Sequence, residues 1–423
     1  MWAFCCRDVG KHKPPRNVKT PFNAFCLVCL LVTPDAPAAQ EKTSPAVEQA
    51  WLDHGFTAAQ REEIRAAFRW GIERKFVPGG SLLIFHRGDA VLREAFGLAD
   101  LEAKRPFTVA DPCRIASITK PHTATLLALL VEQGKLAWDD PVDKHLPYFK
   151  GVTVRGREAA VRSPRIRELL SHTAGFPGQP AIDSGKWTVK SDGTLADAVQ
   201  DLPRQGLAAE PGTVYAYTGL GYMVAGRIAE VITGLEFGAL MAERLLAPMG
   251  ATTATFYPSA ELKAKIPTPY QRKDGEFVKL DLARRADAAG NFPNPAGRLI
   301  STLDDVGRFL LLHRNRGVAD GRRLLAAGSL AALYRAQPNT GAGPNGYGLG
   351  FNVLKTDANG VGVRIRHTGA SGTFAQLDFE HDFFFVILTQ VPQTQTQPFR
   401  DRLLPAIYAV FAPGDVTRRA VRK

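Results

Sequence analysis

The stretch that decides the fold covers residues 113–136 and reads CRIASITKPHTATLLALLVEQGKL. It places Ser117 and Lys120 three residues apart, just ahead of an apolar run with helical spacing. Pro121 is tolerated only in the first turn of a helix, so the helix is predicted to begin near Ser117. Residues three apart share a helix face, which brings the lysine amine within reach of the serine hydroxyl. The pair is either a nucleophile with its base or the polar first turn of an ordinary helix.

The N-terminal segment has the composition of a secretory signal peptide. Basic residues precede the apolar run FNAFCLVCLLV (22–32), and small alanines follow at positions 36, 38 and 39. The run is too short to span a bilayer as a helix. Residues 1–40 are therefore predicted to be a signal peptide and linker, which implies export to the periplasm or the cell exterior and membrane contact through this segment alone. The alternative is an uncleaved amphipathic extension.

Cysteine content and charge limit the chemistry of the remaining chain. Four of the five cysteines lie within the first 29 residues, so a processed chain would keep only Cys113. This excludes an intrachain disulfide and a cysteine metal cluster, and the apolar flanks of Cys113 predict a packed thiol. The net charge of +12 is spread along the chain, with a dense basic tail only at 417–423. No helix-turn-helix, RNP or zinc-finger pattern indicates a nucleic-acid partner.

Strand patterns lie toward both ends of the chain, and helical patterns lie between them. The segment 56–76 predicts an amphipathic helix that begins with a capping box of Thr57 and Gln60. Two strands follow within 79–100, joined by a turn at RGD (87–89). Further helices are predicted at 118–133, 165–171, 194–202, 221–233, 237–248, 302–315, 327–335 and 399–411, and strands resume from 347.

This order of elements predicts an α+β fold. One antiparallel sheet, flanked by helices, is expected to form from both termini (about 56–110 and 345–412), with a mainly helical region (about 111–344) inserted between its strands. Together these parts form one domain over 50–412, followed by a basic tail at 413–423. The loops at 174–193 and 250–298 are long enough to be substrate-binding walls.

Six segments occur in the order found in one family. The segment 117–147, SITKPHTATLLALLVEQGKLAWDDPVDKHLP, resembles the active-site helix and following turn of the serine β-lactamase-like superfamily. This group includes class C β-lactamases, D-alanyl-D-alanine carboxypeptidases (penicillin-binding proteins) and family VIII carboxylesterases. Further segments are similar to the family at 166–177, 211–234, 295–312, 347–351 and 366–390. The resemblance covers about 60–410 and implies the β-lactamase/transpeptidase-like fold.

The resemblance implies a proton-transfer set of three residues. Ser117 matches the acylated nucleophile and Lys120 its lysine partner. Tyr217, in YAYTG, matches the tyrosine that shares proton transfer with the lysine, a task that a neighbouring ammonium favours by lowering the phenol pKa. Tyr215 matches an aromatic packing position in the same segment.

The resemblance also implies a substrate-binding strand. His367, Thr368 and Gly369 match the K-T-G or H-x-G element that lines the cleft, where glycine allows close backbone approach by substrate. The N–H groups of Ala370 and Ser117 would form the oxyanion hole.

Two other histidines are assigned outside the catalytic set. His172, in SHTAG, is interpreted as a buried hydrogen-bonding residue behind the site. His122 is expected to face outward on the first turn of its helix.

Two departures from the family pattern bear on specificity. Gly219 stands where the family often has the asparagine of Y-x-N, whose side chain orients the lysine and the substrate amide. His367 replaces the lysine of K-T-G, and a mostly neutral imidazole binds a substrate carboxylate less firmly than an ammonium does.

The sequence therefore predicts a serine hydrolase that forms an acyl-enzyme at Ser117, with esterase-like activity favoured. The alternatives are a D-alanyl-D-alanine carboxypeptidase or β-lactamase, and, from another class, a non-catalytic peptide- or wall-binding relative. The expected partner is a small-molecule ester, an amide or a cell-wall peptide. No metal or organic cofactor is implied, and no motif sets an oligomeric state.

Overall fold

The computed structural model describes residues 43–155, 159–190, 192–281, 292–341 and 346–414. The predicted signal peptide and nearly all of the basic tail lie outside these ranges. The described residues belong to one compact unit, Ala38–Lys423. Within them, no helix has the length and apolar character needed to cross a membrane.

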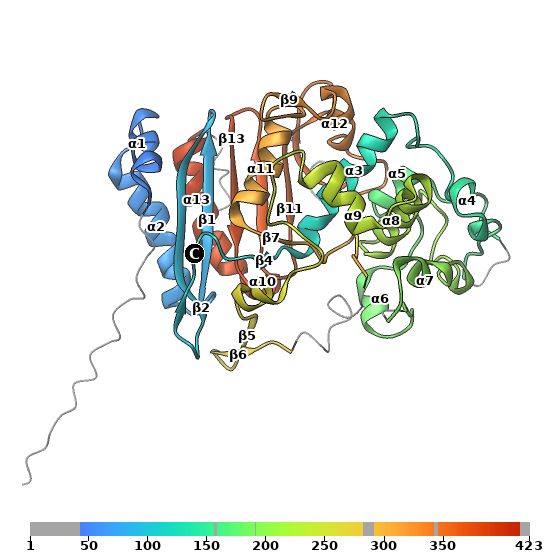
Figure 1. Ribbon diagram of the computed structural model, residues 1–423, viewed down its shortest axis with the longest axis horizontal. Helices are drawn as coiled ribbons and strands as arrows, with labels where there is room; N and C mark the ends of the chain where they lie inside the picture. Colours follow the sequence, from blue (N-terminus) through green and yellow to red (C-terminus); the bar gives the residue numbers. More distant parts are fainter. Residues whose placement is uncertain (1–42, 156–158, 191, 282–291, 342–345, 415–423) are drawn as a thin grey trace, which may run out of the picture. The chain divides into compact units, whose positions relative to one another are not determined.

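The centre of the fold is an antiparallel sheet of seven strands built from both ends of the chain, as predicted (Figure 1). N-terminal β1 pairs with C-terminal β13 in the register Ser81↔Leu388 to His86↔Phe383. In spatial order the strands are β10 (Asn352–Thr356), β11 (Gly362–Thr368), β12 (Phe374–Asp378), β13 (Phe383–Leu388), β1 (Gly79–His86), β2 (Asp89–Asp100) and β3 (Arg105–Pro106).

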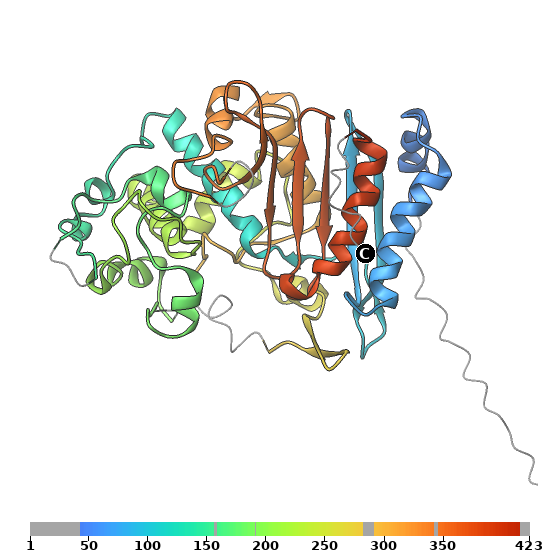
Figure 2. The same ribbon diagram turned by 180° about the vertical axis from the view of Figure 1, so that it is seen from behind.

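Two terminal helices, α2 (Ala58–Glu73) and α13 (Gln397–Phe411), cover one face of the sheet (Figure 2). Helix α2 begins with the predicted capping box, in which the Thr57 side chain accepts from the Gln60 N–H and the Gln60 side chain accepts from the Thr57 N–H. Gly71 lets the two helices approach closely, because a Cβ there would lie 2.3 Å from the Phe399 ring. An additional helix, α1 (Pro45–Asp53), lies ahead of the first predicted helix and buries Trp51 completely.

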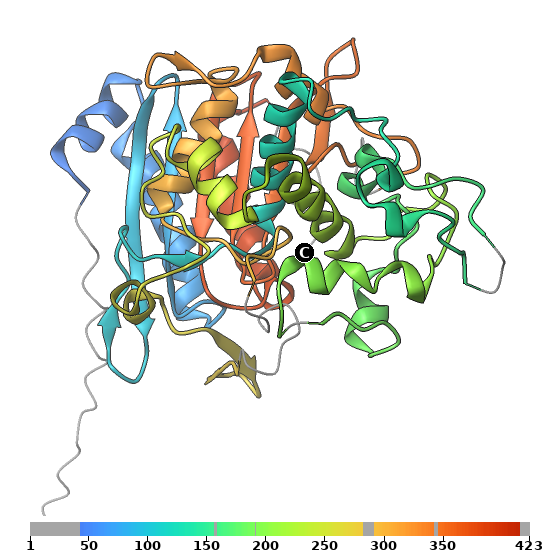
Figure 3. The same ribbon diagram turned by 45° about the vertical axis from the view of Figure 1, so that its right-hand side comes forward.

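The opposite face of the sheet carries α11 (Leu303–Arg314) and then the helical region, which comes forward in Figure 3. One continuous hydrophobic core joins this face to the helical region. The helices of the region are α3 (Thr119–Glu132), α4 (Val142–His145), α5 (Ile166–Leu170), α6 (Gln179–Asp183), α7 (Leu195–Gln200), α8 (Leu220–Thr233), α9 (Phe237–Met241) and α12 (Ala327–Leu333).

Several shorter elements were not resolved by the sequence pattern. The helix expected at 237–248 is α9 followed by a π-turn at Ala242–Leu246. The two long loops contain α6, α10 (Ala260–Lys265) and the hairpin β5 (Tyr270–Lys273)–β6 (Glu276–Lys279). Two further short pairs are β4 (Cys113–Arg114) with β7 (Ile300–Ser301) and β8 (Val318–Ala319) with β9 (Arg322–Arg323). The RGD tripeptide is the predicted hairpin turn, because β1 ends at His86 and β2 begins at Asp89.

The prediction for His122 is wrong. Its side chain is fully buried, its Nδ1–H donates to the carbonyl of Ile118 at 2.8 Å, and its ring stacks on Phe309 with 3.7 Å between centroids. Helix α3 packs against neighbours on all sides, so its polar residues cannot reach solvent on an outer face.

Burial of His122 predicts acid sensitivity. Burial lowers the pKa of His122 to about 4, so below its unfolded value of about 6.5 the unfolded chain binds the proton first. The stability contribution is present above pH 6.5 and is lost as the pH falls toward 4, by about 2 kcal/mol at pH 5. We expect His122→Phe to lose less unfolding free energy than the wild type between pH 7 and pH 5, measured by urea denaturation. Equal losses in the two proteins would contradict this assignment.

Candidate active site

The turn before α3 presents Ser117 at the edge of the core. Strand β4 leads into a 3-10 turn, Ala116–Ile118, after which α3 begins at Thr119, close to the predicted start. Ala116 has φ +47°, a left-handed conformation that costs a residue with a Cβ about 1–2 kcal/mol. The hydroxyl of Thr119 donates to the carbonyl of Ala116 at 2.7 Å and holds this turn closed. Local strain of this kind is typical of functional positions.

Lys120 contacts the predicted nucleophile directly. Its Nζ lies 2.9 Å from Oγ of Ser117 and donates to the carbonyl of Ala296 at 2.8 Å. The lysine side chain is 3 % exposed, and its Nζ lies 4.9 Å from the ring centroid of Tyr217 and 5.5 Å from that of Tyr222. The amine is therefore held on the serine oxygen inside an aromatic cage with little access to water.

Tyr217 is the second side chain on the serine. It is hydrogen-bonded to Ser117, and burial raises its pKa above the ordinary value of 10, an effect that the hydrogen bond only partly offsets. A neighbouring ammonium can lower the pKa of a phenol, but burial is the largest effect on Tyr217. At neutral pH the group is a neutral phenol, which can donate a proton and accept one in turn.

The end of β11 lies against the Ser117 turn. A Cβ on Gly369 would lie 2.5 Å from the carbonyl oxygen of Ile115, so only glycine fits at this contact. The hydroxyl of Thr373 donates to the same carbonyl at 3.0 Å, and that of Ser371 donates to the carbonyl of Arg114 at 2.6 Å. These contacts join the two backbone segments that carry the predicted oxyanion-hole amides.

The two amides themselves are available to a ligand. Over the described ranges, neither the N–H of Ser117 nor that of Ala370 donates a hydrogen bond to another protein group. Both residues are partly exposed, whereas Gly369 between them is buried. Two unoccupied backbone donors on joined segments are what an oxyanion hole requires.

His367 is buried with both ring nitrogens engaged. Its Nδ1–H donates to the carbonyl of Thr368 at 2.8 Å, and its Nε2 accepts from the hydroxyl of Tyr347 at 2.9 Å. Burial, and then the charge of Lys120, lowers the pKa of His367 to about 3, so the imidazole is neutral, as expected. Neither nitrogen is left for a substrate carboxylate. Thr368 is partly exposed beside it, and its hydroxyl oxygen accepts from the side chain of Gln393 at 2.8 Å.

Ala296 is a site residue that the sequence analysis missed. Gly219 caps the start of α8, and a Cβ there would lie 3.2 Å from that of Ala296. The lysine is thus oriented by a main-chain carbonyl next to the position where the family carries asparagine. Asn294 accepts from the N–H of Ala296 at 2.8 Å, and Thr123 donates to the carbonyl of Pro295 at 2.7 Å. These two hydrogen bonds hold the backbone that carries the Ala296 carbonyl. A carbonyl has no sequence signature; only the similarity of the 295–312 segment pointed here.

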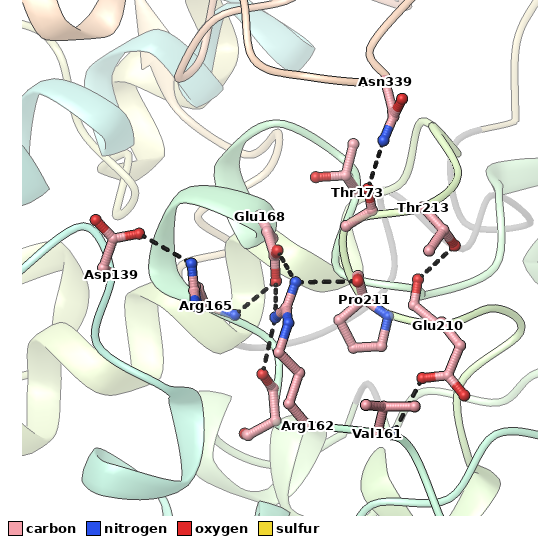
Figure 4. Close-up of polar contacts among 12 residues, drawn as sticks. Asp139, Val161, Arg162, Arg165, Glu168, Thr173, Glu210, Pro211, Thr213 and Asn339 are labelled. Carbon is pink, nitrogen blue, oxygen red and sulfur yellow. Dashed lines mark hydrogen bonds and ion pairs between the residues drawn. The ribbon is translucent and has the colours of Figure 1, made fainter.

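The segment leading to Tyr217 is tied to the end of α5, as Figure 4 shows. Arg162 pairs with Glu168, which is almost completely buried, and donates to the carbonyl of Pro211 at 3.0 Å. The N–H of Gly212 donates to the carbonyl of Thr173 at 2.7 Å, and Asn339 donates to the carbonyl of Gly212 at 2.8 Å. This framework orients the tyrosine segment from behind.

Two other groups in the described part of the chain could carry chemistry, a thiol and a set of possible metal ligands. Cys113 is buried, and burial raises the pKa of its thiol, in line with the predicted packing role. The described residues contain one cluster of possible metal ligands, Asp378, Glu380 and His381. Arg364 already pairs with Asp378 at 2.7 Å, which makes that cluster an ion-pair network.

Comparisons with known proteins agree with this geometry. The family model described as Beta-lactamase matches residues 64–409. Penicillin-binding protein 4 of Amycolatopsis lactamdurans is 33 % identical over 312 residues, which cover 70 % of this chain and 75 % of the relative. Esterase EstB of Burkholderia gladioli is 27 % identical over 336 residues, covering 72 % and 80 %. The solved structure of EstCE1, a hydrolase with promiscuous acyltransferase activity, aligns with a TM-score of 0.69 at 23 % identity, covering 81 % of this chain and 98 % of that one.

The chain belongs to the beta-lactamase family. It has the β-lactamase/transpeptidase-like fold of its structural neighbours and is a serine hydrolase of that family.

The contact of Gly369 with the Ser117 turn generates a prediction. In Gly369→Ala the new Cβ meets Thr373 Oγ1 at 2.1 Å and the Ile115 carbonyl at 2.5 Å, so β11 must move away from the serine. We expect turnover of an ester substrate to fall about 100-fold, with about 1–3 kcal/mol of stability lost.

Gly297→Ala is the matched control, because its new Cβ meets nothing closer than the carbonyl carbon of Ala116 at 3.8 Å. It should keep turnover within about threefold of the wild type. Similar rates in both variants would show that the close approach of β11 is not needed.

Proposed function

We propose that the protein is an esterase that works through an acyl-enzyme at Ser117. The observation that carries the proposal is the 2.9 Å contact between Ser117 Oγ and Nζ of the buried Lys120, with Tyr217 hydrogen-bonded to the same serine. A serine hydroxyl needs an adjacent base to act as a nucleophile at neutral pH. Two proton-transfer groups on one hydroxyl meet that need.

In the proposed acylation step, Lys120 first loses its ammonium proton to solvent. Ser117 Oγ then attacks the carbonyl carbon of the ester while its own proton passes to the free amine. The negative charge that develops on the carbonyl oxygen is stabilised by the N–H groups of Ser117 and Ala370. The carbon–oxygen bond of the ester then breaks, and the alkoxide leaves with a proton from the Tyr217 hydroxyl, which Lys120 replaces. Water then attacks the acyl carbon and gives a proton to Lys120. The bond from that carbon to Ser117 Oγ breaks, the serine takes the proton back, and the acid is released.

Three features favour an ester over an amide. The side chain that would hold a substrate amide is absent at Gly219. Both nitrogens of His367 are engaged, so this position offers no charge to the carboxylate of a penicillin or peptide. Similarity to an esterase of Burkholderia gladioli adds support.

A D-alanyl-D-alanine carboxypeptidase or β-lactamase is the second candidate. The 33 % identity to a penicillin-binding protein favours it. A non-catalytic wall-binding relative is the third, and the absence of the asparagine at 219 is the feature that favours it.

We also propose that the protein is exported after cleavage near residue 40. The basic segment, the apolar run at 22–32 and the alanines that follow support this proposal. The protein recovered from outside the cytoplasm should have a mass lower by about 40 residues, measured by intact mass spectrometry. Full-length protein found only in the cytoplasm would contradict export.

Three substrates separate the candidate activities. Purified wild type and Ser117→Ala are incubated with a short-chain nitrophenyl ester, a chromogenic cephalosporin and a D-Ala-D-Ala peptide. We expect ester turnover in the wild type, at least about 1000-fold less in the variant, and a mass adduct on Ser117 in stopped reactions. Faster turnover of the cephalosporin or the peptide would favour the second candidate. No turnover and no adduct with any probe would leave the non-catalytic protein.

Gly219→Asn tests the cause of the ester preference. The new side chain would supply an amide beside Lys120, after a shift of a few tenths of an ångström at Ala296. We expect the ratio of cephalosporin to ester acylation rates to rise about tenfold, as one hydrogen bond to the substrate amide is gained. An unchanged or lower ratio would show that residue 219 does not set the preference.

A further inference from the structure

His172 holds the backbone on both sides of Tyr217. Its carbonyl accepts from the N–H of Ala216 at 2.8 Å, and its ring Nδ1 accepts from the N–H of Thr218 at 3.2 Å. The imidazole also lies against the tyrosine, with 4.3 Å between ring centroids. One residue therefore limits the position of the Tyr217 backbone and the tilt of its ring.

The hydrogen bonds define the protonation state of this imidazole. A ring nitrogen that accepts from a backbone N–H carries no proton, so the proton of neutral His172 is on Nε2. Burial, and then the charge of Lys120, holds the pKa of His172 well below its ordinary value. The Nε2 atom is buried and has no hydrogen-bond partner in the described part of the chain. The imidazole ring lies 4.3 Å from the ring of Tyr217, 5.3 Å from that of Tyr222 and 4.9 Å from that of Tyr347, between centroids.

A histidine at this position is unfavourable for stability in two ways. His172 follows the last turn of α5 with φ +62°, a place where helices normally end with glycine or asparagine. A buried donor without a hydrogen-bond partner is destabilising as well. Asparagine would remove the backbone strain and could still accept from Thr218. Stability alone therefore does not explain the histidine, and a backbone outlier beside reacting groups points to function.

The surrounding framework makes the contact rigid. The residue after His172 accepts from Gly212 through its carbonyl, and Arg162 holds the carbonyl of Pro211 (Figure 4). The tyrosine segment is thus fixed to the end of α5 upstream of Tyr217. His172 adds the two hydrogen bonds to the residues on either side of Tyr217.

We propose that His172 is a positioning residue that directs the Tyr217 phenol onto the Ser117 oxygen, through the acceptor at Nδ1 and the carbonyl, and that it transfers no proton itself. This inference rests on the role that the proposed function gives to Tyr217. The role of the histidine is indirect, through its contacts with the backbone on either side of the tyrosine.

Three substitutions separate the two ring nitrogens. In His172→Asn the new residue tolerates a positive φ and places an amide oxygen near the Nδ1 position. In His172→Gln the polar atoms lie nearer the Nε2 position. In His172→Leu the side chain has no hydrogen-bond acceptor. His313→Leu is the matched control, because His313 is also a buried neutral histidine but contacts Thr125 and Tyr334.

We expect His172→Asn to keep kcat for the ester within about threefold, with an unchanged acid limb in its pH profile. His172→Leu and His172→Gln should lose about 100-fold in kcat with little change in KM, as for a misplaced catalytic group. His313→Leu should lower the unfolding midpoint while kcat stays within about threefold.

Two results would overturn the proposal. Wild-type kcat in His172→Leu would show that the contact positions nothing. Loss of kcat in His172→Asn together with a shifted acid limb would show that the imidazole transfers protons.

A second measurement keeps this inference separate from the proposed esterase activity. The Cζ resonance of Tyr217 in ¹³C-tyrosine-labelled protein, assigned with Tyr217→Phe, needs no substrate. It should shift or broaden in His172→Leu and stay in place in His172→Asn. If the wild type hydrolyses no ester, the proposed function fails, while this spectrum still decides the positioning claim; identical spectra in the two variants would refute it.

Discussion

The contact between Lys120 and Ser117 depends on helix α3 being buried on every side. An amine that faced water would be solvated, and it would have no reason to stay on a single hydroxyl. Here the helix packs against α8 and α12, and its lysine is 3 % exposed. The contacts on either side then follow: Gly369 and Thr373 hold the sheet to the serine turn, and Ala296 holds the amine.

The two histidines and the tyrosine around the lysine are uncharged. His172 and His367 are both neutral, and burial is the first cause of each lowered pKa, with the lysine charge second. Tyr217 is a neutral phenol for the same reason. Burial thus places neutral donors and acceptors around one basic group, and a proton can move among them without a second charge being buried.

The elements of the fold were predictable where the information is local. A capping box at Thr57 and a proline at 121 mark helix starts, and short apolar runs mark the central strands of the sheet. The orientation of His122 was predicted wrongly, because burial of a polar residue depends on layers contributed by distant segments.

Within the site, the similarity of ordered motifs predicted Ser117, Lys120 and Tyr217 as one set, and the structure brings these three side chains together. The carbonyl of Ala296 escaped this reasoning because any residue carries a carbonyl. The raised pKa of Tyr217 escaped it as well, since desolvation depends on the packed surroundings and not on the residue's neighbours in sequence.

The pairing of β1 with β13 has a consequence for how the chain acquires its structure. The strand that carries Leu82 lies between β2 and a partner about 300 residues later in the sequence. Until that partner is available, one hydrogen-bonding edge of an apolar strand remains open and able to pair with another chain. Closing the sheet is therefore a late, non-local step, of the kind that makes folding slow. The nearly complete chain has to be present before the end of β11 can pack against the Ser117 turn.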